Sequence, residues 1–173
     1  MARSHKLLSV GVFAIGLSAL LVSWAAADGL TRRVQHKFRG RLIVTTSALS
    51  VTGRTQSEAV KAIKAAHQKA IAPARKDGGV AYYSFYWTAF MRRKPRATSL
   101  SLEFYKKEGG KVSSGMSANK GLTGISPNVT ILRGQTQISE DDGVTAGKTY
   151  KVKLVATIGG RDHTLASTFL TFK

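Results

Sequence analysis

The feature that most constrains the fold is a long alternation of apolar and polar residues in the segment TYKVKLVATIGGRDHTLASTFLTF. Every second residue from Tyr150 to Ala156 is aromatic or apolar, and the positions between them include Lys151 and Lys153. A period of two residues predicts a β-strand with one buried and one solvated face. The turn sequence IGGRDH then predicts an antiparallel hairpin between this strand and residues 164–172.

Further segments have the same period. Residues 80–91 (VAYYSFYWTAFM) place Phe85 and Trp87 on one face, and residues 98–107 (TSLSLEFYKK) follow a turn at Pro95. We expect these two segments to pair as a hairpin of long strands. The remaining expectations are a short strand at 111–117, a loop at 118–128, and a strand at 129–139 with Ile131 in the core.

The segment 28–79 predicts a strand followed by a helix. In residues 34–44 (VQHKFRGRLIV), apolar Phe38, Leu42 and Val44 alternate with basic residues, which indicates a strand with one basic face. TQSE then has the form of a capping box, in which Thr55 and Glu58 satisfy each other's backbone N–H groups. The predicted helix covers 56–72 and ends before Pro73. The chain is therefore expected to be mainly β with one helix.

Residues 142–154 carry a more specific pattern, in which an acidic residue, two spaced glycines and a tyrosine precede an alternating strand. Its members are Asp142, Gly143, Val144, Gly147, Tyr150, Val152 and Leu154. The pattern resembles the tyrosine corner of immunoglobulin-like and fibronectin type III-like sandwiches, and Trp87 on an earlier core strand is similar to their buried tryptophan. The resemblance implies an antiparallel sandwich in which the Tyr150 hydroxyl bonds to main chain a few residues upstream.

Two features depart from such sandwiches. The chain has no cysteine, so the inter-sheet disulfide of antibody domains is excluded, and the strand–helix unit is not part of a minimal sandwich. We expect residues 28–79 to pack with a sandwich formed by 80–173 as one globular body. The alternative is an α+β fold with a single antiparallel sheet.

Residues 1–27 predict a secretory signal peptide. A cationic start with Arg3 and Lys6 precedes an uncharged apolar stretch, and Ala25 and Ala27 occupy the small-residue positions before a cleavage site after Ala27. The alternative is an uncleaved membrane anchor, because the stretch 7–27 is long enough to cross a bilayer. The expected location is the periplasm or the extracellular space, and without disulfides the fold has to rest on its apolar core.

The charge is strongly basic. The 27 Lys and Arg residues against 9 Asp and Glu give +18, and removal of Arg3 and Lys6 would leave 25 against 9, or +16. This favours contact with an anionic envelope polymer, lipid head groups or extracellular nucleic acid, although charge that only maintains solubility explains it equally well. The candidate contacts lie on the predicted strand 34–44 and in the turn after residue 91, and they are Lys37, Arg39, Arg41, Arg92, Arg93, Lys94 and Arg96.

No arrangement of residues points to catalysis. His36, His67 and His163 lack the spacing of a metal site, and Ser117 with Lys120 lacks the companion motifs of a Ser-x-x-Lys enzyme. The acidic run 140–142 has no EF-hand spacing. The sequence thus predicts no enzyme, cofactor or metal, but an exported binding or structural module whose partner is another protein or an envelope polymer. The alternative is a basic polyanion-binding protein.

Overall fold

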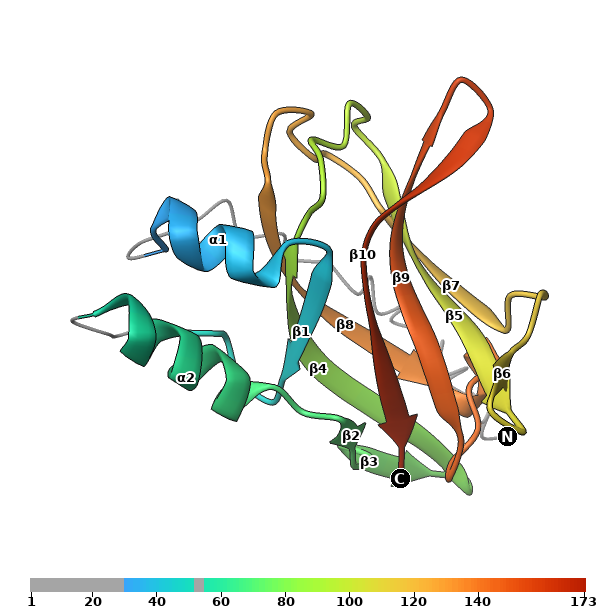
Figure 1. Ribbon diagram of the computed structural model, residues 1–173. Coiled ribbons are helices and arrows are strands. Elements are labelled where there is room, and N and C mark those ends of the chain that lie inside the picture. The colour runs from blue at the N-terminus through green and yellow to red at the C-terminus, as the bar shows by residue number, and fades with distance from the viewer. Residues whose placement is uncertain (1–29, 52–54) are drawn as a thin grey trace, which may run out of the picture.

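A computed structural model describes residues 30–51 and 55–173 of the chain (Figure 1). The predicted signal peptide lies outside these residues. The helical elements are α1 (Arg32–Phe38), α2 (Gln56–Ala66) and the 3₁₀ helix η1 (Glu140–Asp142). The strands are β1 (Arg41–Thr45), β2 (Ala70–Ile71), β3 (Arg75–Asp77), β4 (Val80–Phe90), β5 (Leu100–Glu108), β6 (Lys111–Val112), β7 (Ala118–Leu122), β8 (Ile131–Ser139), β9 (Thr149–Ile158) and β10 (Arg161–Phe172).

All described strands belong to one mixed, 10-stranded sheet, whose central order is β3-β4-β1-β10-β9-β5-β6. β8 pairs with the other side of β4, and β7 pairs with β5. β1 and β2 run parallel to β10, and the other pairs are antiparallel. The sheet curls strongly, so that β4 and β8 face β5 and β9 across an enclosed interior (Figure 1). The expectation of a mainly β protein is confirmed, but the sheet is mixed and curled and is not clearly an antiparallel immunoglobulin-like sandwich.

The main core fills the concave side of the sheet. Phe172 at the end of β10 is fully buried, and its ring lies 4.7 Å from Tyr83 of β4, 6.2 Å from Phe104 of β5 and 5.6 Å from Tyr150 of β9, measured between ring centroids. One ring thereby joins the strands on opposite sides of the interior. The predicted core role of Trp87 is confirmed, because its indole is 1% exposed and donates to Thr136 Oγ1 at 2.9 Å.

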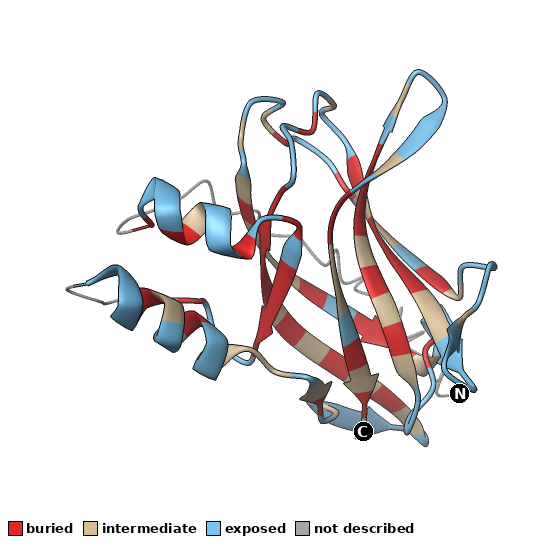
Figure 2. Ribbon diagram, viewed as in Figure 1, coloured by how far each residue is buried: buried red, intermediate tan, exposed pale blue. Residues whose placement is uncertain are grey.

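A second apolar layer lies on the outer side of β1 and β4. Val34 and Phe38 of α1 and Ile63 of α2 pack there against Ile43 and Phe90. Figure 2 shows both helices with buried residues toward the sheet and exposed residues away from it. The capping box at the start of α2 is confirmed, since Glu58 N–H donates to Thr55 Oγ1 at 3.2 Å and Thr55 N–H donates to the Glu58 carboxylate at 3.0 Å.

The tyrosine corner has the expected geometry. Tyr150 is 1% exposed at the start of β9, and its hydroxyl oxygen accepts a hydrogen bond from Thr145 N–H, five residues upstream, at 2.9 Å. Gly147 supplies the turn with a left-handed φ of 75°, where glycine avoids a Cβ clash. The hairpin of β9 and β10 is also confirmed.

The predicted strand over 34–44 is wrong in its first part, which forms α1. Thr31 caps this helix, and its side chain accepts from Val34 N–H. Val34 and Phe38 are four residues apart, a spacing that places two side chains on one face of either a helix or a strand. The segment forms a helix instead of a strand, and in the helix both side chains are buried together against Phe90. Only Arg41–Thr45 forms the strand, β1.

The predicted hairpin of 80–91 with 98–107 is also wrong. β4 pairs with β1, β3 and β8, whereas β5 pairs with β6, β7 and β9. The connection between them, residues 91–99, is longer than a usual hairpin loop of two to five residues. Its Arg92 N–H donates to Leu165 O of β10 at 2.9 Å, so the connection crosses to the other half of the sheet.

Smaller differences concern three other segments. The expected loop 118–128 contains β7, and Ile131 is only partly buried, whereas Leu132 and Ile138 carry the core contacts of β8. The second helix ends at Ala66 instead of Ala72, because the next residue, His67, bonds to β1.

Candidate anion-binding surface

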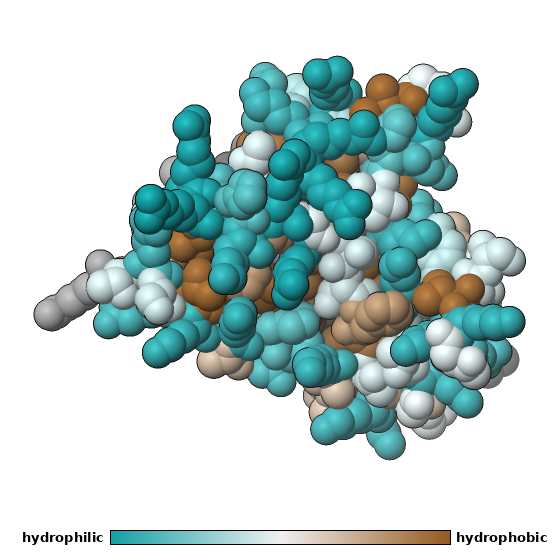
Figure 3. Space-filling view, in the orientation of Figure 1, coloured by the Kyte–Doolittle hydropathy of each residue, from teal (hydrophilic) through white to brown (hydrophobic). Residues whose placement is uncertain are grey.

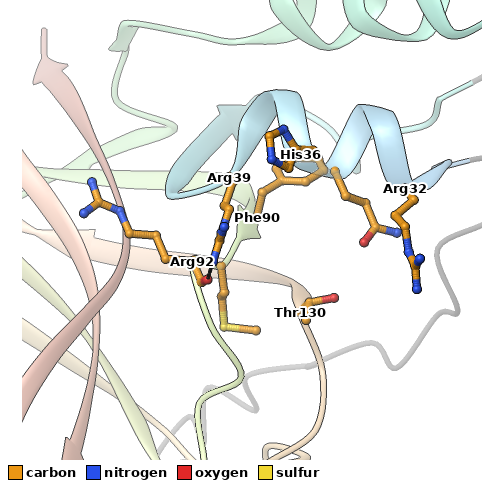
Figure 4. Close-up of a pocket in the computed structure, with 8 residues that line it drawn as sticks. Arg32, His36, Arg39, Phe90, Arg92 and Thr130 are labelled. Carbon is orange, nitrogen blue, oxygen red and sulfur yellow. Dashed lines mark hydrogen bonds between the residues drawn. The ribbon is translucent and has the colours of Figure 1, made fainter.

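One face of α1 gathers basic side chains. Arg32, His36 and Arg39 follow one another at helical spacings of four and three residues, so they lie along the side of α1 that is not packed on the sheet. All three are exposed, while the buried side of the helix consists of Val34 and Phe38. Together with Phe90, Met91, Arg92 and Thr130, they line a hollow of about 250 Å³ (Figure 4).

Arg39 is fixed at the centre of this hollow. Its Nε and Nη2 atoms donate to the backbone carbonyl oxygen of Arg92 at 2.9 and 2.7 Å. Gly40, with φ of 81°, lets the Arg92 side chain pass close by, since a Cβ at position 40 would lie 2.5 Å from Arg92 Nε. A guanidinium group has five N–H donors, so the Arg39 side chain retains donors for a ligand after making these two bonds.

The guanidinium groups around the hollow do not converge on one point. Figure 4 shows the Arg32 guanidinium on one side of Arg39 and the Arg92 guanidinium pointing away on the other side. A single small anion would be held best by donors directed at the same point. A row of separated cations instead matches an extended chain of negative charges.

A second hollow adjoins the first along the chain. Arg93, Lys94 and Arg96 line it with Ile158 and His163 from the β9–β10 hairpin, and its volume is about 340 Å³. Arg96 has a left-handed φ of 54°, which costs about 1–2 kcal/mol for a residue other than glycine. Arg92 lines the first hollow, and the next residue along the chain, Arg93, lines the second.

Most of the basic residues predicted from the sequence lie in this region. Arg41 is exposed on the outer face of β1, between Phe90 of β4 and Ser167 of β10. Lys37 is exposed on α1 but lines neither hollow. We use the name arginine surface for the set Arg32, Arg39, Arg41, Arg92, Arg93, Lys94 and Arg96. Figure 3 shows hydrophilic side chains gathered over α1 and the adjacent ends of β1 and β10.

Arg32 and His36 were not among the candidate contacts predicted from the sequence, because residues 34–44 were expected to form a strand and no helix was expected before residue 56. A signal for a helix was nevertheless present. Thr31 is a good N-cap residue, and the apolar residues 34 and 38 follow it at helical spacing. A helix starting there would have placed Arg32, His36 and Arg39 on a common side.

Acidic residues do not line either hollow within the described part of the chain. The acidic run 140–142 instead forms hydrogen bonds around the tyrosine corner. Glu140 accepts from Ala146 N–H and Ala81 N–H, both at 3.1 Å, and these two hydrogen bonds lower the pKa of its carboxyl group. Burial opposes ionisation of Asp142, but its bonds with Lys120 and Ser139 prevail and lower its pKa.

Among residues 30–51 and 55–173, no three His, Asp or Glu side chains are grouped as metal ligands. The helices in the same ranges include none that could span a membrane.

No family model matches the sequence, and comparisons with curated proteins and with solved structures found no significant match.

Proposed function

We propose that this protein is a non-catalytic, extracytoplasmic binding protein whose ligand is a polyanion held on the arginine surface. The observation that carries the proposal is the row of exposed guanidinium groups from Arg32 past Arg39 to Arg92, continued by Arg93. The charged and apolar order of residues 1–27 supports the extracytoplasmic location.

Physical reasons favour a polymer as the ligand. Each Lys or Arg that neutralises a phosphate or similar group releases condensed counterions, so several separated contacts add affinity without a deep pocket. The walls of both hollows consist mainly of cations and a few apolar groups, with His36 and Thr130 in the first hollow and His163 in the second. Such walls suit contacts with several separated anionic groups. A repeated anion would also use Arg41, which lies outside the two hollows.

The local geometry of the tyrosine corner supports a likeness to immunoglobulin-like and fibronectin type III-like modules at that corner. Such modules serve many unrelated functions, so the likeness favours a stable scaffold and does not select the ligand. The proposed class of ligand therefore rests on the arginine surface alone.

The direct test is the salt dependence of binding to inorganic polyphosphate and heparin, measured with residues 28–173. We expect binding at low salt with a linear fall of log affinity against log salt concentration. The triple variant Arg32→Gln, Arg41→Gln and Arg93→Gln should bind more weakly and lower the slope by roughly 0.7–0.9 for each anionic group that is no longer neutralised. These side chains are exposed, so folding should be retained.

A matched control removes the same charge elsewhere. Lys61, Lys64 and Lys69 are exposed on and just after α2, away from the two hollows. Their triple replacement by Gln should leave the slope nearly unchanged. Equal losses in the two variants would mean that only net charge matters, and absence of binding at low salt would refute the proposal.

A further inference from the structure

A second surface lies on the outer face of β5, β9 and β10, where the side chains of alternate residues point to solvent. The cross-strand partners Tyr105, Lys151 and Phe169 form one row of this face. Phe169 is 45% exposed, an unusual position for a phenylalanine in the middle of a strand. Lys107 and Lys153 lie on the same face of their strands, in the adjacent rows.

The two rings of this row carry ammonium groups against their faces. Lys153 Nζ lies 3.8 Å from the centroid of the Tyr105 ring, and Lys107 Nζ lies 5.0 Å from the centroid of the Phe169 ring. Both distances are within the range of cation–π attraction. The face thus alternates aromatic rings with positive charges. We call Tyr105, Lys107, Lys151, Lys153 and Phe169 the aromatic–lysine face.

Glu103 fixes the position of Tyr105 without adding an exposed negative charge. Its carboxylate accepts from the Tyr105 hydroxyl at 2.7 Å and from the Ser101 hydroxyl at 3.0 Å, and its side chain is buried. The hydrogen bond to Glu103 is the main cause that raises the pKa of Tyr105 to about 12. The tyrosine therefore stays neutral and its ring keeps one orientation.

The aromatic–lysine face is continuous with the arginine surface. Arg41 of β1 is the register partner of Ser167 of β10, and Ser167 is the partner of Lys153 of β9. Neighbouring strands are about 5 Å apart, so one row of outward side chains leads from Arg41 to Lys153 over roughly 10 Å. A single extended ligand can cross β10 and contact both surfaces.

We infer that the polyanion is single-stranded nucleic acid, whose bases stack on the aromatic–lysine face, chiefly on Phe169, while its phosphates contact the lysines and the arginine surface. This inference rests on the proposed function and names the chemical class of its ligand. Tyr105 and Phe169 are two strand spacings apart, roughly 10 Å, with Lys151 between them. A strand of nucleotides carries the same alternation of flat rings and anionic groups.

Other polyanions use this face less well. Duplex DNA has its base faces stacked inside the helix, so it offers phosphates but no ring for Phe169. Sulfated or carboxylated glycans and polyphosphate have no aromatic ring to stack. The exposed ring of Phe169 would then contribute little, and binding would depend on charge alone.

The test compares four probes by fluorescence anisotropy at one salt concentration. The probes are an oligothymidylate of about 15 nucleotides, an abasic strand of equal length, a duplex of equal length, and polyphosphate as competitor. We expect the oligothymidylate to bind at least about ten-fold more tightly than the abasic strand or the duplex. Phe169→Ala should remove most of that difference and leave binding of the abasic strand unchanged.

Met116→Ala is the matched control, because Met116 is the other large exposed apolar residue of the described chain, at 48% exposure. It should leave all affinities unchanged. Equal affinity for base-bearing and abasic strands, no effect of Phe169→Ala, or polyphosphate outcompeting the oligothymidylate would each overturn the inference. If polyphosphate still binds in those cases, the proposed function stands, whereas absence of binding to every probe refutes both.

Discussion

At the scale of single residues, Tyr150 connects the sequence pattern to the observed structure most directly. Its ring fills the core beside Phe172, and its hydroxyl holds the turn that precedes β9. The pattern predicted this because a buried tyrosine requires a hydrogen-bond partner, and the nearest one is the backbone of the same turn. Local chemistry of this kind can be predicted from sequence, since all participants lie within a few residues.

Tyr150→Phe should lower the free energy of unfolding by about 1–2 kcal/mol, because Thr145 N–H loses its acceptor while the ring stays in place. Urea denaturation followed by circular dichroism measures the change. Tyr86→Phe is a suitable control, since Tyr86 is a half-buried tyrosine of β4 whose hydroxyl bonds to no described residue. Equal losses in both variants would show that the corner hydrogen bond contributes nothing specific.

At the scale of elements, His67 joins parts of the sheet that do not pair directly. β1 and β10 are register partners only at Arg41 and Ser167, after which they separate. The His67 ring lies between them, where its Nδ1 accepts from Val44 N–H at 3.1 Å and its Nε2 lies 3.4 Å from Thr168 Oγ1. Accepting at Nδ1 requires the neutral imidazole, with its proton on Nε2.

Acidification should therefore weaken this junction. Burial lowers the pKa of His67 below 6.5 in the folded protein, and the charges of Lys69 and Arg41 act in the same direction. Between that lowered value and 6.5 the unfolded chain binds more protons, so stability should fall as the pH drops from about 7 through this interval. His67→Asn keeps an acceptor for Val44 N–H but does not titrate. The unfolding free energy of this variant should therefore not fall over this pH interval. An identical pH profile for both proteins would contradict the assignment.

The elements themselves were predictable to different degrees. The long strands β4, β9 and β10 have a clear period of two, and α2 has its capping box. α1 was not predicted, because residues 34 and 38 fit a helix and a strand equally well. Strand pairing was harder to predict from the sequence, since β4 pairs with β8 and β5 pairs with β9 through residues that lie far apart in the chain.

At the scale of the whole molecule, positive charge is poorly compensated. The chain has 27 Lys and Arg residues against 9 Asp and Glu, and the described residues form only two ion pairs, Lys106–Glu108 and Lys120–Asp142. Repulsion among like charges favours expanded states of the chain. The folded protein should therefore respond to screening by salt.

Raising NaCl from about 0.01 to 0.2 M should increase the Tm by about 2–5 °C, because the shorter Debye length weakens this repulsion. Differential scanning calorimetry without any polyanion measures the shift. Lys61→Glu with Lys64→Glu lowers the net charge by four and should reduce the response. A Tm that falls with salt would mean that attractive ion pairs dominate instead.

Like the strand pairing, the candidate site was only partly predictable, because its residues come together from segments that are far apart in the sequence. The run from Arg92 to Arg96 is evident in the sequence, but its contact with Arg39, 53 residues away, requires the fold. Lys151 and Lys153 were expected to face solvent, whereas their alignment with Tyr105 and Phe169 depends on the register of three strands.

The position of β10 has a consequence for biosynthesis. This strand pairs with β9, β1 and β2 and brings Phe172 into the core. Until residues 161–172 have been made, β1 therefore has only β4 as a sheet partner, and β2 lacks its partner strand. A nascent chain on the ribosome therefore cannot complete its fold before its last strand has been synthesised.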